Sequence, residues 1–200
     1  MHLKTILCAL ALSLPIAADV GAFPATAKDK ATTSRPAMGW DDRPEAAIWT
    51  AKALMALSEH DAVLAGRVPA DIAVWCPGYA DATIEERRAF WSGLMSAVAY
   101  HESRWLPHVV GGGGRYIGLM QISPGTAKGV GCEVQNSSGL KDGGENLACA
   151  VEIMAWQVKR DGVVAGPKAN GGVARHWGPM KSSKKRAQMA AFTKAQDYCR

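Results

Sequence analysis

The sequence predicts a mostly α-helical single domain, and three observations support this fold class. Helix-start signals recur along the chain, at Asp41–Glu45, at Thr83–Glu86 and at Ser123-Pro124. No stretch shows the strict alternation of apolar and polar residues that marks a half-buried β-strand. The chain has 200 residues, of which 48% are hydrophobic and 20% charged, a balance typical of a globular domain and not of a disordered chain.

The first 22 residues have the layout of a secretory signal peptide. A basic start at Lys4 precedes the apolar stretch Ile6–Ile16, and small residues follow at Ala18 and Ala22, where we expect cleavage. The stretch is too short to span a bilayer, although a membrane anchor is the alternative interpretation. No second long apolar run follows in the sequence, which excludes a protein with several membrane spans. We therefore expect the mature protein in the periplasm or outside the cell.

Residues 23–40 are polar and contain proline, so we expect a linker there and the folded domain over residues 41–200. The first helix is predicted from about residue 44 to residue 64, shortly before Gly66. Its apolar members are Ile48, Leu54, Met55, Leu57 and Val63.

The second helix, which opens at Thr83–Glu86, is the most informative element. Its apolar residues Phe90, Leu94 and Val98 recur every four positions and form one stripe, and the next position on that stripe is Glu102. A carboxyl group in a partly apolar site has a raised pKa, and one that is still protonated near neutral pH can donate a proton to a glycosidic oxygen. The alternative is an ordinary surface carboxylate. The stripe favours Glu102 as a candidate general acid.

Three more helices are expected in the second half of the chain. A short one begins at Ser123-Pro124, a longer one covers residues 144–160, and the last covers residues 183–197. The longer helix presents one apolar face, made by Leu147, Val151, Met154 and Val158. A glycine-rich loop over residues 162–172 follows it.

The cysteines predict two disulfides in an exported protein. Four remain after removal of the signal peptide, and three pairings are possible. We favour Cys132–Cys149, because these two are close in sequence and flank a Gly/Asn/Ser-rich loop, which leaves Cys76–Cys199. A zinc site is the weaker alternative, because the spacings contain no CxxC.

Glycines and aromatic residues in the middle of the chain suggest a sugar-binding surface. Gly111–Gly114 and Gly118 permit positive φ or a close approach of the backbone to a ligand, and Gln121 offers both donors and an acceptor. Candidate aromatic platforms for sugar faces are Trp105, Tyr116 and Trp177. The alternative is a flexible surface loop with tryptophans in the core.

These residues together resemble the soluble lytic transglycosylase domain of peptidoglycan-cleaving enzymes. The resemblance rests on Glu102-Ser103, on the segment Gly118–Ile122 (GLMQI) with the following Ser123-Pro124-x-Thr126-Ala127, and on Asn146-Leu147 at the start of a long helix. It covers roughly residues 84–180.

The resemblance implies a lysozyme-like helical fold with an active-site cleft. It implies cleavage of the β-1,4 bond between N-acetylmuramic acid and N-acetylglucosamine, with formation of a 1,6-anhydro product and without a metal or cofactor. Glu102 would act first as the acid and then as the base. Ser103 would orient the substrate, Gly118, Met120 and Gln121 would line the cleft, and Asn146 would support it.

The sequence departs from the family pattern near the end of the domain. The family has an A-Y-N-A-G segment whose tyrosine helps to hold the catalytic glutamate, and this chain lacks it. His176 or Trp177 would take that place, or else Tyr100 or Tyr116. No acidic residue lies in the GLMQI segment, so Glu102 has no evident second carboxylate as partner.

The net charge of +5 is concentrated at the C-terminal end, where residues 175–200 hold seven basic side chains and one acidic one. Such a tail favours an anionic envelope polymer or an acidic partner protein, and an exported chain is not expected to bind nucleic acid. Together with the family resemblance, it suggests docking to a flagellar, secretion or conjugation machine. The alternative for the tail is a solvated helix face. Two other functions stay open: a hydrolytic muramidase and a non-catalytic peptidoglycan-binding assembly factor.

Overall fold

The structure is a computed structural model that describes residues 35–200. The predicted signal peptide over residues 1–22 and most of the predicted linker over residues 23–40 lie outside the described residues. The end of that linker belongs to the domain, because Met38 and Trp40 are buried in its core. The Trp40 indole donates to Thr50 Oγ1 over 2.9 Å, which attaches this segment to the first helix.

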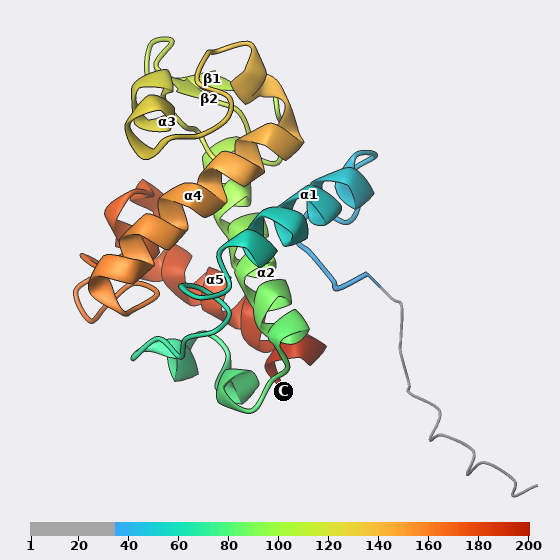
Figure 1. Cartoon of the computed structure of the whole chain (residues 1–200), viewed down its shortest axis with the longest axis vertical. Coiled ribbons are helices and arrows are strands. Elements are labelled where there is room, and N and C mark those ends of the chain that lie inside the picture. Colours follow the sequence, from blue (N-terminus) through green and yellow to red (C-terminus); the bar gives the residue numbers. More distant parts are fainter. Residues whose placement is uncertain (1–34) are drawn as a thin grey trace, which may run out of the picture. The chain divides into compact units, whose positions relative to one another are not determined.

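Five α-helices and several short 3-10 helices make up most of the described residues, which confirms the mostly helical fold class (Figure 1). The α-helices are α1 (Ala46–Glu59), α2 (Ile84–Ser103), α3 (Pro124–Val130), α4 (Gly143–Asp161) and α5 (Ser183–Lys194). Each corresponds to a helix expected from the sequence. Within residues 35–200, none of these helices combines the length and the apolar character that crossing a bilayer would need.

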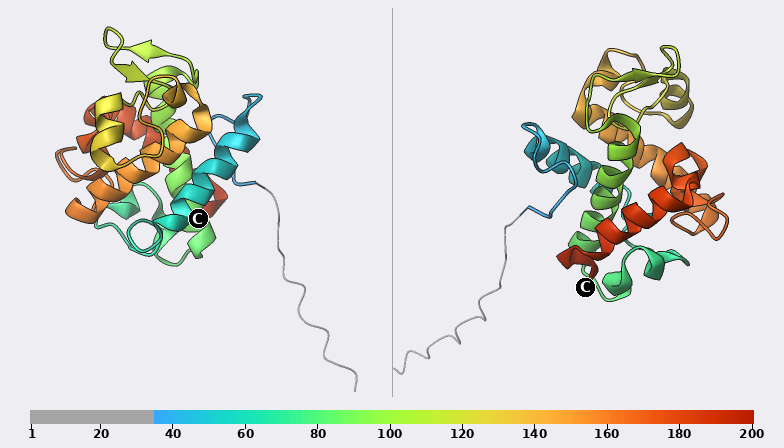
Figure 2. Two further views of the ribbon diagram at one scale, coloured as in Figure 1. Left: turned by 45° about the horizontal axis from the view of Figure 1, so that its top comes forward. Right: turned by 180° about the vertical axis from the view of Figure 1, so that it is seen from behind.

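Helix α2 is the centre of the domain. Helices α1 and α4 pack together on one side of it and α5 crosses it on the other, as the front and rear views show (Figures 1 and 2). The predicted stripe of Phe90, Leu94 and Val98 is fully buried between these layers. Burial of each such side chain contributes about 2 kcal/mol to stability, so the position of α2 is determined by its packing on all sides.

The two ends of α2 have clear local causes. At the start, Thr83 Oγ1 accepts from the Glu86 N–H over 3.2 Å, while Glu86 Oε2 accepts from the Thr83 N–H over 2.8 Å, which is the predicted capping box. At the end, Arg104 and Trp105 both have positive φ, 57° and 59°. The chain therefore turns sharply away directly after Glu102 and Ser103 and leaves the helix end open on one side.

A small antiparallel hairpin follows α2 and was not expected from the sequence. Strands β1 (Val110–Gly111) and β2 (Tyr116–Ile117) pair across a turn made by glycines 112–114, all with positive φ. These strands left no alternating pattern in the sequence, because strands of two residues are too short to show a period. The glycine-rich segment is thus a hairpin turn.

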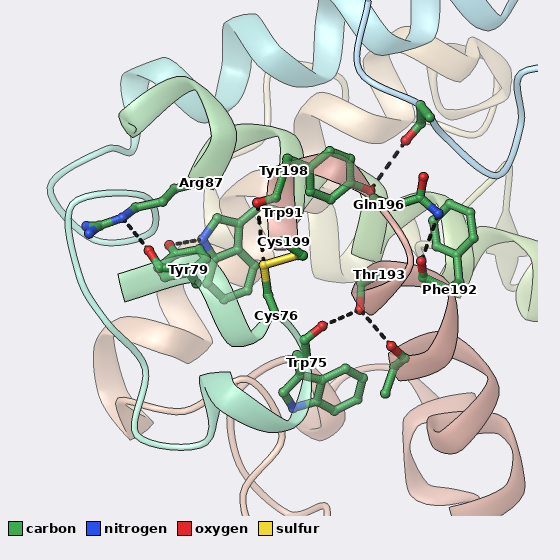
Figure 3. The surroundings of a disulfide bond; sticks show 12 residues. Trp75, Cys76, Tyr79, Arg87, Trp91, Phe192, Thr193, Gln196, Tyr198 and Cys199 are labelled. Atoms are coloured by element: carbon green, nitrogen blue, oxygen red, sulfur yellow. Dashed lines mark hydrogen bonds between the residues drawn. A yellow bond between two sulfur atoms is a disulfide. The ribbon is translucent and has the colours of Figure 1, made fainter. Parts of the chain in front are cut away.

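Both disulfides favoured from the sequence are present, Cys76–Cys199 and Cys132–Cys149. The first joins the C-terminus to the segment before α2, in a region that Figure 3 shows with its hydrogen bonds. There the Thr193 hydroxyl donates to the Trp75 carbonyl over 2.6 Å, and the Trp91 indole donates to the Tyr79 hydroxyl over 2.9 Å (Figure 3). The C-terminal segment is therefore fixed against the core.

Two aspartates hold the glycine-rich loop over residues 162–172. The Asp71 carboxylate accepts from the backbone N–H groups of Val164, Ala165 and Gly166 over 2.6, 2.9 and 2.9 Å. Asp161 accepts from the Gly172 N–H over 2.8 Å and from Arg175 Nε over 2.6 Å. The loop leads directly into the residues after position 175, so these two carboxylates determine where that segment lies.

Candidate active site

An open pocket of about 400 Å³ lies at the C-terminal end of α2. Its lining comes from α2, the hairpin, the start of α3 and the segment around η5 (Gly178–Lys181). The lining residues are Glu102, Arg115, Tyr116, Gln121, Ser123, Thr126, His176, Trp177, Gly178 and Pro179.

Glu102 is half-buried in this pocket and has an unusual protonation equilibrium. Burial raises the pKa of its carboxyl group from 4.5 to about 7, against the opposing effect of the positive charge of Lys185 on α5. Within residues 35–200 its carboxyl group makes no hydrogen bond with another protein group. At neutral pH a large fraction of Glu102 therefore carries a proton that is available to a ligand.

Two histidines near Glu102 are driven toward their neutral form. Burial, Lys185 and Arg104 lower the pKa of His101, and burial lowers the pKa of His176. Only His176 lines the pocket, where its ring lies 4.9 Å from the Trp177 ring in an edge-on arrangement. At neutral pH His176 is thus an uncharged group with donor and acceptor nitrogens.

The hairpin and the GLMQI segment form a second wall of the pocket, to which they contribute Arg115, Tyr116 and Gln121. Gln121 has positive φ, 49°, and its side-chain amide donates to the carbonyls of Val109 and Gly118 over 3.2 and 2.9 Å. These bonds fix the side chain of Gln121, which is a lining residue of the pocket. Tyr116 on β2 also lines the pocket and is 41% exposed, so its ring is accessible to a ligand.

Asn146 on α4 holds this wall from inside the protein. Its Oδ1 accepts from the Met120 N–H over 2.8 Å, and its Nδ2 donates to the carbonyls of Ile117 and Leu140 over 3.0 and 2.9 Å. Gly118 has φ +81°, and a Cβ at this position would collide with Asn146 and with the Leu140 carbonyl. Only glycine allows the backbone to lie this close to the asparagine.

Ser103 and Trp177 tie the same wall to the two neighbouring elements. The buried Ser103 hydroxyl donates to the Leu119 carbonyl over 2.9 Å, and the Trp177 indole donates to the Met120 carbonyl over 2.9 Å. The wall is therefore bonded to α2 through Ser103 and to the segment after the loop through Trp177.

The structure brings five of the nine predicted catalytic and binding residues together around the pocket: Glu102, Tyr116, Gln121, His176 and Trp177. It places the other four behind the lining. Gly118 and Met120, expected to line the cleft, are buried, and Ser103, expected to orient the substrate, is bonded to backbone carbonyls. Asn146 has the expected supporting position.

Sequence reasoning missed several lining residues, notably Arg115, Ser123 and Thr126. Arg115 has no periodic signal, because it follows a glycine turn, and its place next to Tyr116 was the only available clue. Ser123 and Thr126 were expected at a helix start and as part of the family resemblance, but not as lining residues, and Ser123 Oγ accepts from the Thr126 N–H over 3.0 Å. Trp105, a candidate sugar platform, instead donates its indole N–H to the Ser96 carbonyl over 2.8 Å.

Metal binding has no evident ligand set in the described part of the chain. No group of three or more His, Cys, Asp or Glu side chains gathers there in a way that would hold an ion. None of the four predicted disulfide cysteines could ligate a metal without breaking a disulfide bond, since all four are paired.

Comparisons with known proteins agree with this geometry. A family model described as the transglycosylase SLT domain matches residues 82–191, a range that contains every lining residue of the pocket. No curated protein sequence matches the chain. Among solved structures, wild-type DslA (Bd0314) has a TM-score of 0.74 at 24% identity, and a glutamate-to-glutamine mutant of DslA has 0.76 at 24%. Each comparison covers 84% of this chain and 100% of the other, and shows a shared fold.

Proposed function

This chain belongs to the transglycosylase SLT domain family, and from that premise we propose that it is a peptidoglycan lytic transglycosylase that uses Glu102 as its one catalytic carboxyl group. The bond cleaved would be the β-1,4 linkage between N-acetylmuramic acid and N-acetylglucosamine. The product would carry a 1,6-anhydro end on the muramyl residue.

The first step needs an acid, and the burial of Glu102 supports this role. With a pKa of about 7, the carboxyl group is protonated in much of the population at neutral pH and can donate its proton to the glycosidic oxygen. The bond between that oxygen and the anomeric carbon of the muramyl residue then breaks, and the leaving sugar departs with a new hydroxyl group.

The second step needs a base, and Glu102 has become a carboxylate. It would take the proton from the C6 hydroxyl of the muramyl residue, whose oxygen then bonds to the anomeric carbon and closes the anhydro ring. Glu102 ends the cycle protonated, as it began. The reaction therefore consumes no water and needs no second carboxyl group. The positive charge of Lys185 favours the carboxylate stage between the two steps.

One observation carries this proposal. Among the residues that line the pocket in the described part of the chain, Glu102 is the only carboxylic acid. A glycosidase that hydrolyses its substrate usually needs two carboxyl groups, either about 5 Å apart or about 6.5–9.5 Å apart. A pocket with a single carboxyl group supports a mechanism in which the C6 hydroxyl of the muramyl residue attacks its own anomeric carbon.

The test is digestion of purified peptidoglycan by the oxidised chain, with mass spectrometry of the product ends. We expect anhydromuramyl ends, and a loss of turnover of at least about 100-fold in Glu102→Gln with glycan binding retained. Glu59→Gln, at an exposed position at the end of α1, is the matched control and should keep full activity.

Two other results would replace the proposal. Reducing muramyl ends would identify a hydrolytic muramidase. Binding without any Glu102-dependent cleavage would identify a non-catalytic peptidoglycan-binding protein. The pocket supports the enzyme more than the binding protein, because a pure sugar-binding site gains nothing from an acid with a raised pKa.

Export and a partner machine complete the proposal. We propose a periplasmic location, which the signal peptide expected from the sequence and the two disulfides support, because disulfides form in oxidising compartments. Of the basic side chains after residue 175, Arg186 donates to the carbonyls of Met180 and Lys181, and Arg200 pairs with Asp197. The lysines of α5 and the turn before it are the part of the tail left to contact an acidic envelope component.

A further inference from the structure

Arg115 is the one lysine or arginine among the pocket-lining residues that the structure describes. It follows the glycine turn of the hairpin and precedes Tyr116, and both side chains are exposed. Its backbone N–H donates to the Gly111 carbonyl over 3.1 Å, so its attachment point is fixed although its side chain is long.

The guanidinium of Arg115 has no charged partner in the part of the chain that the structure describes. Across residues 35–200, no carboxylate forms an ion pair with it, whereas Arg35, Arg88, Arg160, Arg175 and Arg200 all have one. Its described interaction is with the Tyr116 ring, whose centroid lies 5.9 Å away, at the outer limit of a cation–π contact. The five donors of this group are therefore available to a ligand.

Further positive charge lies on the chain that follows the lining residues Gly178 and Pro179. Gly178 and Pro179 line the pocket, and the chain continues directly from them to Lys181 and then to Lys184 and Lys185 at the start of α5. The charge of Lys185 acts on both Glu102 and His101. Apart from Glu102 no negative group lines the pocket in the described residues, so its field attracts anions.

The sugars of a peptidoglycan strand give such a field nothing to attract, because their hydroxyl and acetamido groups are neutral. In a peptide-bearing strand the lactyl carboxyl group of each muramyl residue is amide-linked to its peptide, so the negative charges are the carboxylates of these attached peptides. We propose that Arg115 binds a carboxylate of this peptide, so that the pocket prefers strands that carry peptides with free carboxylates. A guanidinium suits this role because it holds a carboxylate through two parallel hydrogen bonds. The inference rests on the proposed function and adds its substrate preference.

The experiment compares one peptidoglycan preparation, freed of accessory polymers, before and after chemical amidation of its carboxyl groups. Cleavage is measured with the wild-type chain, Arg115→Gln and Arg67→Gln. Arg67 is exposed and lies outside the pocket lining. Arg67→Gln removes the same charge as Arg115→Gln, so it is the matched control. Binding of Glu102→Gln to both preparations is measured by co-sedimentation.

We expect the wild-type chain to favour the native preparation by about fivefold in kcat/KM. The change should be mainly in KM, because amidation removes an interaction that the ground state and the transition state make equally. Arg115→Gln should remove this preference, Arg115→Lys should keep part of it, and Arg67→Gln should retain it. High salt should weaken it. Equal cleavage of both preparations by the wild-type chain, or an unchanged preference in Arg115→Gln, would overturn the inference while the proposed function stands. If neither preparation is cleaved, the proposed function fails, and equal co-sedimentation of the two preparations would then overturn the inference as well.

Discussion

The pocket has two walls that are held in place by different forces. The helical wall is the last turn of α2 with Glu102, and it rests on the buried stripe of Phe90, Leu94 and Val98. The irregular wall is the segment over residues 110–122, which contains the hairpin and the GLMQI turn. Its backbone is held by hydrogen bonds with the side chains of Ser103, Asn146 and Trp177. One wall is thus positioned by apolar burial and the other by a few polar side chains.

The difference between the walls matters for the chemistry. A carboxyl group with a raised pKa needs surroundings that exclude water, and a packed helix end provides them. A wall that contacts a hydroxyl-rich strand needs backbone groups and amides near the ligand, and an irregular segment can present them where a regular helix cannot. The cost is that the irregular wall depends on very few interactions.

The largest expected effect is on the irregular wall, in Asn146→Ala. This change leaves the Met120 N–H and the carbonyls of Ile117 and Leu140 without their partner, and we expect a loss of about 4 kcal/mol in the free energy of unfolding. Leu94→Ala in the stripe below the helical wall should cost about 3 kcal/mol by leaving a cavity. Urea denaturation measures both.

The two variants should also differ in function. At a temperature where both are folded, Asn146→Ala should bind glycan strands more weakly than Leu94→Ala does, because only the first removes hydrogen bonds that hold the backbone beside the lining residue Gln121. A loss below about 1 kcal/mol in Asn146→Ala, or equal glycan affinity in the two variants, would show that the irregular wall is held by other contacts.

The same contrast explains what could be predicted from the sequence. The helices and the place of Glu102 follow from a four-residue apolar repeat and a capping box, signals that lie close together along the chain. The irregular wall leaves no such signal: its strands have two residues each, and Asn146 reaches backbone groups as many as 29 residues away. Asp71, whose partners lie 93 to 95 residues away, was missed for the same reason.

The family resemblance supplied part of what periodicity could not. It pointed to Asn146 as a support and to Gln121 as a lining residue, and the structure has both in those positions. It did not indicate Arg115, which lies in the turn where this chain has four consecutive glycines. Which side chain follows such a turn is not set by the packing of the fold, so it can vary with the ligand.

The second prediction concerns the cost of placing Glu102 in the helical wall. Its pKa is about 7 in the folded chain and near 4.5 in the unfolded chain, so between these values the folded state binds more protons. The free energy of unfolding should therefore fall as the pH rises from about 4.5 to about 7, by about 2 kcal/mol after allowance for partial solvation of the group. Glu102→Gln, which cannot ionise, should lose this dependence and be the more stable protein at pH 8.

Urea denaturation at pH 5 and at pH 8 measures this difference, with Glu59→Gln as a control that should follow the wild-type chain. In parallel, kcat/KM should decline as the pH rises through about 7, because the acid form of Glu102 is lost. A stability of the wild-type chain that rises from pH 5 to pH 8 relative to Glu102→Gln would contradict a buried acid in the helical wall.

The smallest expected effect is at Asp161, which positions the segment that carries His176 and Trp177 and so contacts the irregular wall only through that segment. The hydrogen bond from Arg175, together with bonds from the Gly172 N–H and Arg160, lowers the pKa of Asp161 from 3.8 to about 2. Its contribution to stability is therefore present above pH 3.8 and is lost as the pH falls through about 2.

We expect Asp161→Asn to lower the free energy of unfolding by about 1 kcal/mol at pH 6, with a difference from the wild-type chain that narrows as the pH is lowered from 5 toward 2. Asp197→Asn is the control, because Asp197 also pairs with an arginine but its side chain is 93% exposed, so its removal should change little. If polar side chains hold the irregular wall through the Trp177 indole, Asp161→Asn should also raise KM for glycan strands while kcat is kept. A changed kcat with unchanged KM would instead mean that the ion pair acts on the helical wall, and that the two walls are not held independently.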